Sequence, residues 1–566
     1  MPGTAISPTL VSVPTGMDTD TRKVPAVITS AGCSGKRTGS PHGCGHATFT
    51  LRRGDRSRLS HAFRRLHRLA LFIFLAGSLL LLGQPSVAAG SVPSTLPSPV
   101  VPDGLGLNVN YKALLQAPAS ILDLLCAAGF HTIRTDLDWR YVERTPGVYD
   151  FAGPGYDAFV QEMYRRGERT ILILDYSNPL YDHDLSPYDD SGRQAFARFA
   201  SAAVSHFHGM GVVWELYNEP DNHGYWRPTP DATAYAALVN AVVPAMRAMD
   251  PGSVIVGPAL HANNPTTRLF YGPLGKAKAL AKFDAISVHP YRTLPPETMI
   301  ADDAALRQLL ARYGVAVPIL NSEVGYSLTS DVGTTWGTGA LASIITPPRA
   351  NPDTHRSLTA NEQAAALVRT YLVGLSQGVN LTVWYDWRDD CSDPALTERQ
   401  CHYGVLDRRL QPKPPLLAAQ TLSTVLSGYH FVARLPVPSS HETALSFANG
   451  SAVAYALWSD IPWQTEALSL PLSGSWVLLD MFGTHSRVFR ANGSSAIVLT
   501  GTPEYLLPLP SSPAATLGST TPTSDPTPSG LPTGVDGVAA TVTATPRQTA
   551  TTTPIALPTT ASRVAS

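Results

Sequence analysis

This sequence has little charge and few cysteines. Of its 566 residues, 15% are charged, the formal net charge is -1 and five are cysteine. A chain without excess positive charge has no general attraction to nucleic acid or acidic lipid. It also has no Cys-x-x-Cys pair and no spacing typical of metal ligands, so we expect no cofactor and no metal. Small neutral polar molecules are the substrate class that this composition favours.

Long apolar runs are also scarce, and the N-terminal region holds a short one. Leu69 to Gly83 is 15 residues without a charge; an arginine-rich stretch precedes it and Ser86-Val87-Ala88 follows. A membrane span needs ~20 apolar residues. The pattern therefore predicts a basic leader over 1–68, a signal over 69–89 cleaved near Ala88, and a secreted or surface-associated protein. A retained N-terminal anchor is the alternative.

Two of the five cysteines bound one polar loop. Cys391 and Cys401 enclose a segment that contains proline and no apolar run. In an exported protein this pair is expected to form a disulfide, which would stabilise the loop by roughly 3 kcal/mol. Two free thiols are the other interpretation. Cys126 lies in an apolar helical pattern and is expected to be a core thiol.

Between residues 103 and 430, short apolar runs alternate with amphipathic stretches. The runs are rich in Val, Ile and Leu without a polar alternation, as in parallel strands that are buried on both faces. Eight such units predict an α/β fold, the (β/α)8 or TIM barrel. A doubly wound open sheet competes, but the first run lacks its glycine-rich phosphate turn. The eight predicted strands are 105–110, 131–139, 169–176, 212–219, 253–260, 283–291, 318–323 and 381–387.

The pattern changes on either side of this region. Residues 90–102 are a Ser/Pro linker. Residues 431–510 hold short β-like runs separated by Gly, Asn, Pro and Ser, which predict a small antiparallel β-sandwich. Residues 511–566 are rich in Thr, Ser and Pro, which predicts a disordered tail.

In a (β/α)8 barrel, polar residues at strand ends carry the chemistry. Asn218 and Glu219 end the fourth predicted strand, and Glu323 ends the seventh. Strands three apart in the ring place these carboxylates on facing sides of one mouth. Glycoside hydrolysis with retention of configuration needs such a pair ~5–5.5 Å apart, one as acid/base and one as nucleophile. Their mutual repulsion is expected to keep one protonated near neutral pH.

Other strand-end residues suit a sugar site. Asn218 is expected to contact a sugar 2-hydroxyl. Arg134 and Tyr291 are expected to hold the Glu323 carboxylate. His289 is predicted as a substrate contact, with a buried core histidine as the alternative. A ring face for sugar stacking is predicted at Trp384, with a place in the barrel core as the alternative, and subsite walls are predicted at Trp139 and Trp226. Glu215 alternates in phase with Glu219, and we expect it to pair with Arg134 inside the barrel.

These residues resemble the retaining (β/α)8 glycoside hydrolases of the cellulase-like clan, and family 39 and bacterial exopolysaccharide hydrolases above all. The similarity rests on GFHTIRTDLDWRYVERTPGVYDF, WELYNEPDNHGYWRPTPDATAYAAL and the Glu of SEVG, and spans roughly 103–430. It implies Glu219 as acid/base, Glu323 as nucleophile and the sandwich as an accessory domain. Leu320-Asn321-Ser322 departs from the family's usual residues before the nucleophile.

Two other functions remain open from the sequence. One is a non-catalytic carbohydrate-binding or cell-wall protein built on a barrel scaffold, although such a protein has no need of both carboxylates. The other is a transglycosylase that uses the same two glutamates. In each case an oligo- or polysaccharide is the expected ligand, with neither nucleic acid nor a specific protein partner. We expect the loop that follows the eighth strand to help decide whether chains are cut internally or at an end.

Overall fold

The computed structural model describes residues 95–261, 265–328, 358–391, 399–437, 439–460 and 466–509. The leader, signal and tail predicted from the sequence lie outside these residues, as does the first part of the 90–102 linker. None of the described helices is long and apolar enough to cross a membrane.

Eight parallel strands close into a barrel in the order β1-β10-β9-β8-β7-β6-β5-β2, which confirms the predicted fold. Each predicted strand is present, and most are shorter than predicted at their C-terminal ends. The fourth, for example, ends at Leu216 rather than Glu219. The barrel strands are β1 (Leu105–Asn108), β2 (Thr132–Asp138), β5 (Arg169–Asp175), β6 (Val212–Leu216), β7 (Val254–His261), β8 (Ala285–His289), β9 (Ile319–Val324) and β10 (Thr382–Trp384).

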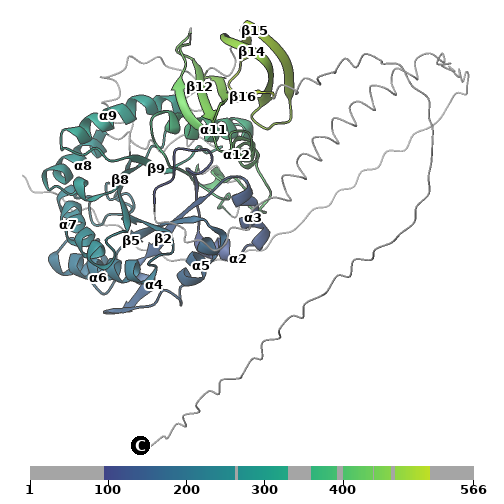
Figure 1. Cartoon of the computed structure of the whole chain (residues 1–566). Helices are drawn as coiled ribbons and strands as arrows, with labels where there is room; N and C mark the ends of the chain where they lie inside the picture. The colour runs from purple at the N-terminus through teal and green to yellow at the C-terminus, as the bar shows by residue number, and fades with distance from the viewer. Residues whose placement is uncertain are drawn as a thin grey trace, which may run out of the picture. The chain divides into compact units, whose positions relative to one another are not determined.

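A helix follows each barrel strand, and Figure 1 shows these helices around the strands. They are α3 (Ala119–Ala127), α5 (Tyr156–Arg166), α6 (Asp190–His206), α7 (Ala232–Met249), α8 (Pro265–Lys276), α9 (Met299–Ala311), α11 (Ala360–Ser376) and α12 (Pro414–Val425). Six of them coincide with amphipathic stretches in the sequence. The pattern of α8 is interrupted by Pro273, and α12 begins at two prolines, so neither gives a clear helical signal.

Shorter elements occupy the loops of the barrel. They are α2 (Tyr111–Gln116), α4 (Trp139–Val142), the β3 (Glu143–Thr145) and β4 (Val148–Tyr149) hairpin, and the 3-10 turns η1 (Asp182–Asp184), η2 (Leu280–Lys282), η3 (Pro296–Thr298) and η4 (Arg399–His402).

The barrel interior is filled by apolar side chains from alternating strand positions. Ile171, Val213, Val256, Leu320 and Val383 form one buried cluster with side chains from five strands. This cluster closes the interior, so the polar side chains further along the strands face a mouth rather than a pore.

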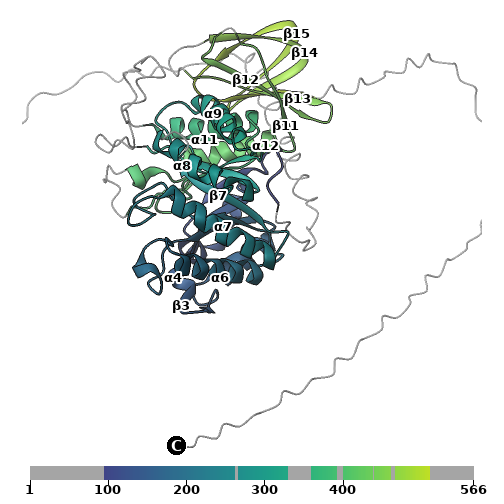
Figure 2. The ribbon, with the colours of Figure 1, turned by 90° about the vertical axis from the view of Figure 1, so that its left-hand side faces the viewer.

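The C-terminal region forms the expected antiparallel domain, a six-stranded sheet in the order β11-β12-β13-β16-β14-β15 (Figure 2). Its longest strands form a hairpin that is paired from Glu466↔Leu499 to Leu479↔Ser486. The strands are β11 (His430–Arg434), β12 (Glu442–Asn449), β13 (Ala452–Ser459), β14 (Glu466–Asp480), β15 (Ser486–Leu499) and β16 (Glu504–Pro508).

This sheet bends over its own core, as the predicted sandwich requires. The first half of β14 pairs only with β15, yet its Leu468 and Leu470 share a buried cluster with Ala444 of β12 and Leu457 of β13. Residues that alternate with these belong to the barrel's cluster instead, among them Trp458. One face of the sheet therefore covers its own core and the other packs on the barrel.

Candidate active site

The Asn218-Glu219 pair lies in a tight turn just past β6. Tyr217 and Glu219 have backbone φ angles of 71° and 45°, in the left-handed region that side chains other than glycine rarely adopt. A strand that ends in such a turn cannot continue its ladder. The turn therefore ends the strand and holds Glu219 at its carboxyl end, where the residue is only 5% exposed.

Arg134, on β2, is the centre of the site's hydrogen-bond network. Its Nε donates to Glu215 Oε2 at 2.7 Å, and its Nη1 donates to Glu323 Oε2 at 2.6 Å and to Asn108 Oδ1 at 2.9 Å. Its Nη2 donates to Asn218 Oδ1 at 2.9 Å. Two carboxylates and two amides thus share one buried guanidinium, which is 1% exposed. The pairing of Arg134 with Glu215 that we expected is present.

Glu323, at the end of β9, is held at both carboxylate oxygens. Arg134 binds Oε2, and the Tyr291 hydroxyl donates to Oε1 at 2.9 Å. The side chain keeps 14% of its surface exposed to the mouth. Two donors, one of them charged, hold this carboxylate in one direction.

Glu219 lies directly across from Glu323. One carboxylate oxygen of Glu219, one of Glu323 and a ring nitrogen of His289 all lie within 4.8 Å of one another. Glu219 Oε1 accepts a hydrogen bond from His289 Nδ1 at 2.8 Å, and Oε2 accepts one from Asn222 Nδ2 at 2.9 Å. One oxygen of each carboxyl group therefore lies within 4.8 Å of the other, which is compatible with the ~5–5.5 Å separation of retaining enzymes.

The protonation of Glu219 differs from the expectation of a raised pKa. Burial by itself raises the pKa of this carboxyl, but the hydrogen bond from His289 and the positive charge nearby outweigh burial. The pKa of Glu219 therefore lies below its usual value in the unliganded protein. The donors around this carboxylate, rather than its distance from Glu323, decide its ionisation.

His289 connects the two halves of the network. Its Nε2 is 3.3 Å from Arg134 Nη2, and its Nδ1 is 2.8 Å from Glu219. Arginine can only donate, so Nε2 must accept and Nδ1 carries the proton. Both ring nitrogens have protein partners and the residue is 1% exposed. His289 thus orients Glu219, and its predicted contact with substrate is not what the structure favours.

The three predicted tryptophan surfaces need correction. Trp139, Trp226 and Trp384 are each 1% exposed. Trp139 donates its Nε1 proton to Glu143 at 2.6 Å and stacks on Tyr181. Aromatic neighbours cover Trp226, and Trp384 donates to a backbone carbonyl. Buried rings of this kind stabilise the loops and the barrel rather than offering a face to a sugar.

Aromatic surface is supplied by tyrosines that were not predicted as faces for a sugar. Tyr225, in the loop after β6, is 38% exposed and stacks on Tyr176 with ring centroids 5.5 Å apart. Tyr385, just past β10, packs against Tyr291 with ring centroids 6.4 Å apart. Tyrosines that follow a strand in an irregular loop carry no periodic signal, so only the structure shows which rings line the mouth.

A second carboxyl pair lies beside Arg134. Asp136 is exposed to the mouth, whereas Asp175 is fully buried. Burial, followed by the negative charge of Asp136, raises the pKa of Asp175 well above its usual value. The protonated form of Asp175 is therefore favoured relative to an exposed aspartate.

The distances among Glu219, His289 and Glu323 would also allow a metal ion. Arg134, however, donates into the same cluster, and its positive charge repels a cation. Both nitrogens of His289 are already in use. We therefore assign these side chains to hydrogen bonding and proton transfer.

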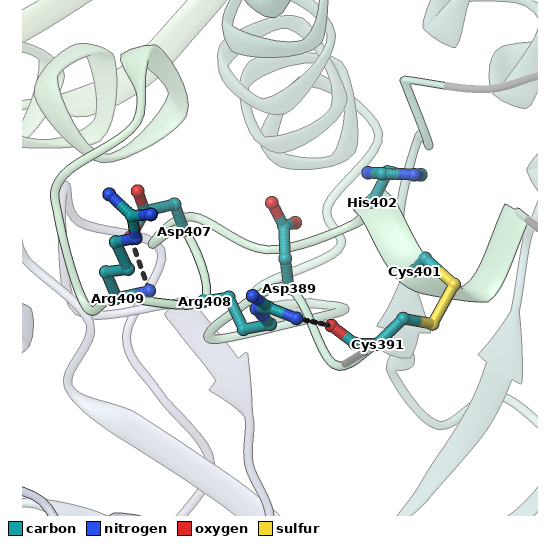
Figure 3. Close-up of a pocket in the computed structure, with 7 residues that line it drawn as sticks. All are labelled: Asp389, Cys391, Cys401, His402, Asp407, Arg408 and Arg409. Carbon is teal, nitrogen blue, oxygen red and sulfur yellow. Dashed lines mark hydrogen bonds between the residues drawn. A yellow bond between two sulfur atoms is a disulfide. The ribbon is translucent and has the colours of Figure 1, made fainter. Parts of the chain in front are cut away.

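The loop after β10 is closed by the predicted disulfide between Cys391 and Cys401. Figure 3 shows this disulfide beside Arg408, which donates to the Cys391 carbonyl at 3.2 Å. The disulfide lines a pocket that includes neither glutamate of the site. Its link to the site is indirect: Tyr403, two residues after Cys401, packs on Tyr291 with ring centroids 5.9 Å apart.

Comparison with known proteins agrees with this geometry. Residues 106–335 match the sequence model of cellulase, glycosyl hydrolase family 5. The fold is similar to a family 39 glycoside hydrolase from Bacteroides cellulosilyticus WH2, with a TM-score of 0.59 and 22% identity over 75% of this chain and 83% of that one. A family 39 beta-xylosidase from Caulobacter crescentus has a TM-score of 0.50 and 15% identity over 73% and 98% of the two chains. No curated protein sequence matches the chain.

The barrel, the paired glutamates and the cellulase match together define a glycoside hydrolase, an enzyme of the O-glycosyl hydrolase class. Within that class, the chain is similar to the (β/α)8 hydrolases of the cellulase-like clan: residues 106–335 match the family 5 model, and the fold is similar to that of a family 39 enzyme.

Proposed function

We propose that the chain cleaves O-glycosidic bonds in oligo- or polysaccharides by double displacement, with Glu219 as acid/base and Glu323 as nucleophile. One observation carries this assignment: two carboxylates on β9 and in the turn after β6 have oxygens within 4.8 Å of each other. Each of them also has its own fixed donors.

In the first step, a Glu323 oxygen attacks the anomeric carbon of the sugar. The bond from that carbon to the leaving oxygen breaks, and protonated Glu219 gives its proton to that oxygen. Arg134 and Tyr291 hold the attacking carboxylate at 2.6 Å and 2.9 Å, so little reorganisation is needed. The Nδ2 amide of Asn218 is left to donate to a sugar hydroxyl, because its Oδ1 is bound to Arg134.

In the second step, Glu219 is ionised and removes a proton from water as the water attacks the same carbon. The bond to Glu323 breaks and the sugar leaves with its original configuration. The hydrogen bonds from His289 and Asn222 stabilise the ionised form of Glu219 that this step begins with.

The test is a panel of 4-nitrophenyl glycosides and plant and bacterial polysaccharides, with wild type, Glu219→Ala and Glu323→Ala. Xylosides head the panel, because a family 39 beta-xylosidase and a family 30 endoxylanase from Clostridium papyrosolvens C71 share the fold at TM-scores of 0.50. Added azide should restore turnover in both variants. With Glu219→Ala the glycosyl azide should keep the substrate's configuration, and with Glu323→Ala it should have the opposite one.

Three results would separate the alternatives. Turnover in Glu323→Ala without azide would remove Glu323 as nucleophile. Binding of polysaccharide without turnover by the wild type would indicate a non-catalytic scaffold. Predominant transfer to an added sugar acceptor, rather than to water, would indicate a transglycosylase. Glu162→Gln on α5 is a matched control, since the Glu162 carboxylate accepts hydrogen bonds from Arg165 and Arg166 of the same helix.

We also propose that the enzyme is exported and associated with the cell envelope. The arginine-rich segment before a short apolar run and the disulfide at Cys391 support an oxidising compartment. N-terminal sequencing of the protein recovered from the culture medium should give a start just after Ala88. Recovery only from membranes, with residues 69–83 intact, would support an uncleaved anchor instead.

A further inference from the structure

A second histidine approaches the Glu219 carboxylate from β7. His261 Nε2 lies 3.3 Å from Glu219 Oε1, the same oxygen that His289 binds from β8. His261 ends its strand, and 23% of its side chain is exposed to the mouth. Two imidazoles therefore reach the same oxygen of this carboxylate, and Arg134 fixes the tautomer of His289.

The other ring nitrogen of His261 faces a buried carboxylate. His261 Nδ1 lies 3.9 Å from Asp221 Oδ1, which is an ion-pair distance rather than a hydrogen bond. The Asp221 side chain is 2% exposed, and its Oδ1 is buried without a hydrogen-bond partner. Its other oxygen accepts from Thr267 Oγ1 of α8 at 2.6 Å. An anion held in this way favours a positive charge on the imidazole beside it.

We propose that His261 and Asp221 form a positioning pair that holds a positive charge against the acid/base Glu219 and so confines turnover to acidic pH. The inference rests on the proposed function, because it needs Glu219 to act as the acid. His261 would not itself touch the reacting atoms. It would act through Glu219, at the same oxygen that His289 binds.

The carboxylates around His261 all favour its protonated form. Burial lowers the pKa of His261, but its interaction with Asp221 and the charges of Glu219 and Glu323 raise it to about 9. Below that pH the imidazole is cationic. Glu219 is also faced by Glu323 from β9, by Tyr225 from its own loop, and by Arg134 of β2 through His289.

The consequence for pH follows from the roles of the two glutamates. Bond cleavage needs Glu219 protonated, so activity falls as pH rises through the pKa of Glu219. A cation 3.3 Å away lowers this pKa and moves the basic limb of the pH profile toward acid. Removing the cation should move that limb back toward neutral pH.

The experiment measures kcat/KM against pH for wild type, His261→Gln and Asp221→Asn. The substrate is the 4-nitrophenyl glycoside that the wild type hydrolyses fastest. We expect the basic limb to move up by about one pH unit in both variants. KM should stay within a factor of two. His208→Gln is a matched control, because His208 pairs with Asp250 at 3.3 Å and is 68% exposed. Its profile should coincide with that of the wild type.

A second substrate distinguishes this role from a structural one. A 2,4-dinitrophenyl glycoside leaves without protonation, so its rate should be nearly unchanged in His261→Gln, whereas a loosened site would slow both substrates equally. A basic limb that stays in place in both folded variants, or an equal loss at every pH, would overturn the inference and leave the proposed function intact. A wild type whose turnover does not depend on Glu219 would instead overturn the proposed function.

Discussion

Arg134 and Glu215 form an ion pair inside the barrel, with Nε and Oε2 2.7 Å apart. Both side chains are at most 1% exposed. Burial alone raises the pKa of Glu215, but the Arg134 charge outweighs it and the pKa lies below its usual value. Arg134 therefore offers its positive charge to Glu323, and the buried charges of Arg134 and Glu215 compensate each other.

Arg134→Met should destabilise the protein and abolish turnover. The substitution leaves the buried Glu215 carboxylate without its partner, which costs about 3–5 kcal/mol in free energy of unfolding. Urea denaturation measures this loss. Arg134→Met combined with Glu215→Gln should recover much of the stability, because no buried charge is then left unpaired, but it should not recover activity. Equal stability of the single and double variants would contradict this account.

Tyr291→Phe should lower kcat/KM by about ten- to a hundredfold. The substitution removes the hydrogen bond at 2.9 Å to Glu323 Oε1 and keeps the ring that packs on Tyr403. A hydrogen bond to a charged group is worth about 1.5–3 kcal/mol. Steady-state kinetics on the best substrate measures the effect, with Tyr455→Phe in the β-sheet domain as a control of unchanged activity. A loss below twofold would mean that Arg134 alone positions the nucleophile.

Asp303 should make the protein less stable as pH rises from 4 to 7. This α9 side chain is 3% exposed, and burial raises its pKa to about 6. The folded state therefore binds a proton that the unfolded state releases near pH 4, so stability is lost as pH rises through 6. Asp303→Asn should raise the free energy of unfolding by up to about 3 kcal/mol at pH 7 and change it little at pH 4. Denaturation at both pH values tests this, and Asp190→Asn, on an exposed side chain, should change neither.

The barrel and the glutamate pair were predictable from the sequence because two local signals coincide. Continuous apolar runs mark strands that are buried on both faces, and the polar residues at their ends must gather at one rim. His261 satisfies the same rule at the end of β7, and the rule applied to that strand would have found it. By contrast, the irregular turn at Tyr217 shortens β6 and is set by the loop's packing, which no periodicity records.

The burial of the tryptophans could not be predicted in the same way. Whether a ring faces a ligand or a core depends on residues distant in sequence, such as Tyr181 against Trp139. The pKa of Glu219 depends likewise on His289, which lies 70 positions away. Sequence spacing identifies the acid, but only the assembled environment shows in which direction its pKa moves.

The β-sheet domain should unfold together with the barrel. Trp458 of β13 donates its Nε1 proton to Glu297 Oε1 at 2.7 Å, and Glu297 also accepts from Arg369 of α11. Burial raises the pKa of Glu297, but the Arg369 charge and these donors lower it overall, so a buried carboxylate depends on a residue from each domain. Trp458→Phe should lower the free energy of unfolding by about 1.5–3 kcal/mol. It should also lower the melting temperature of the whole molecule, which should unfold in a single calorimetric transition.

Trp476→Phe is the control, because the Trp476 indole donates to a carbonyl within the sheet. It should destabilise less, and two separate transitions in the wild type would show that the domains fold independently.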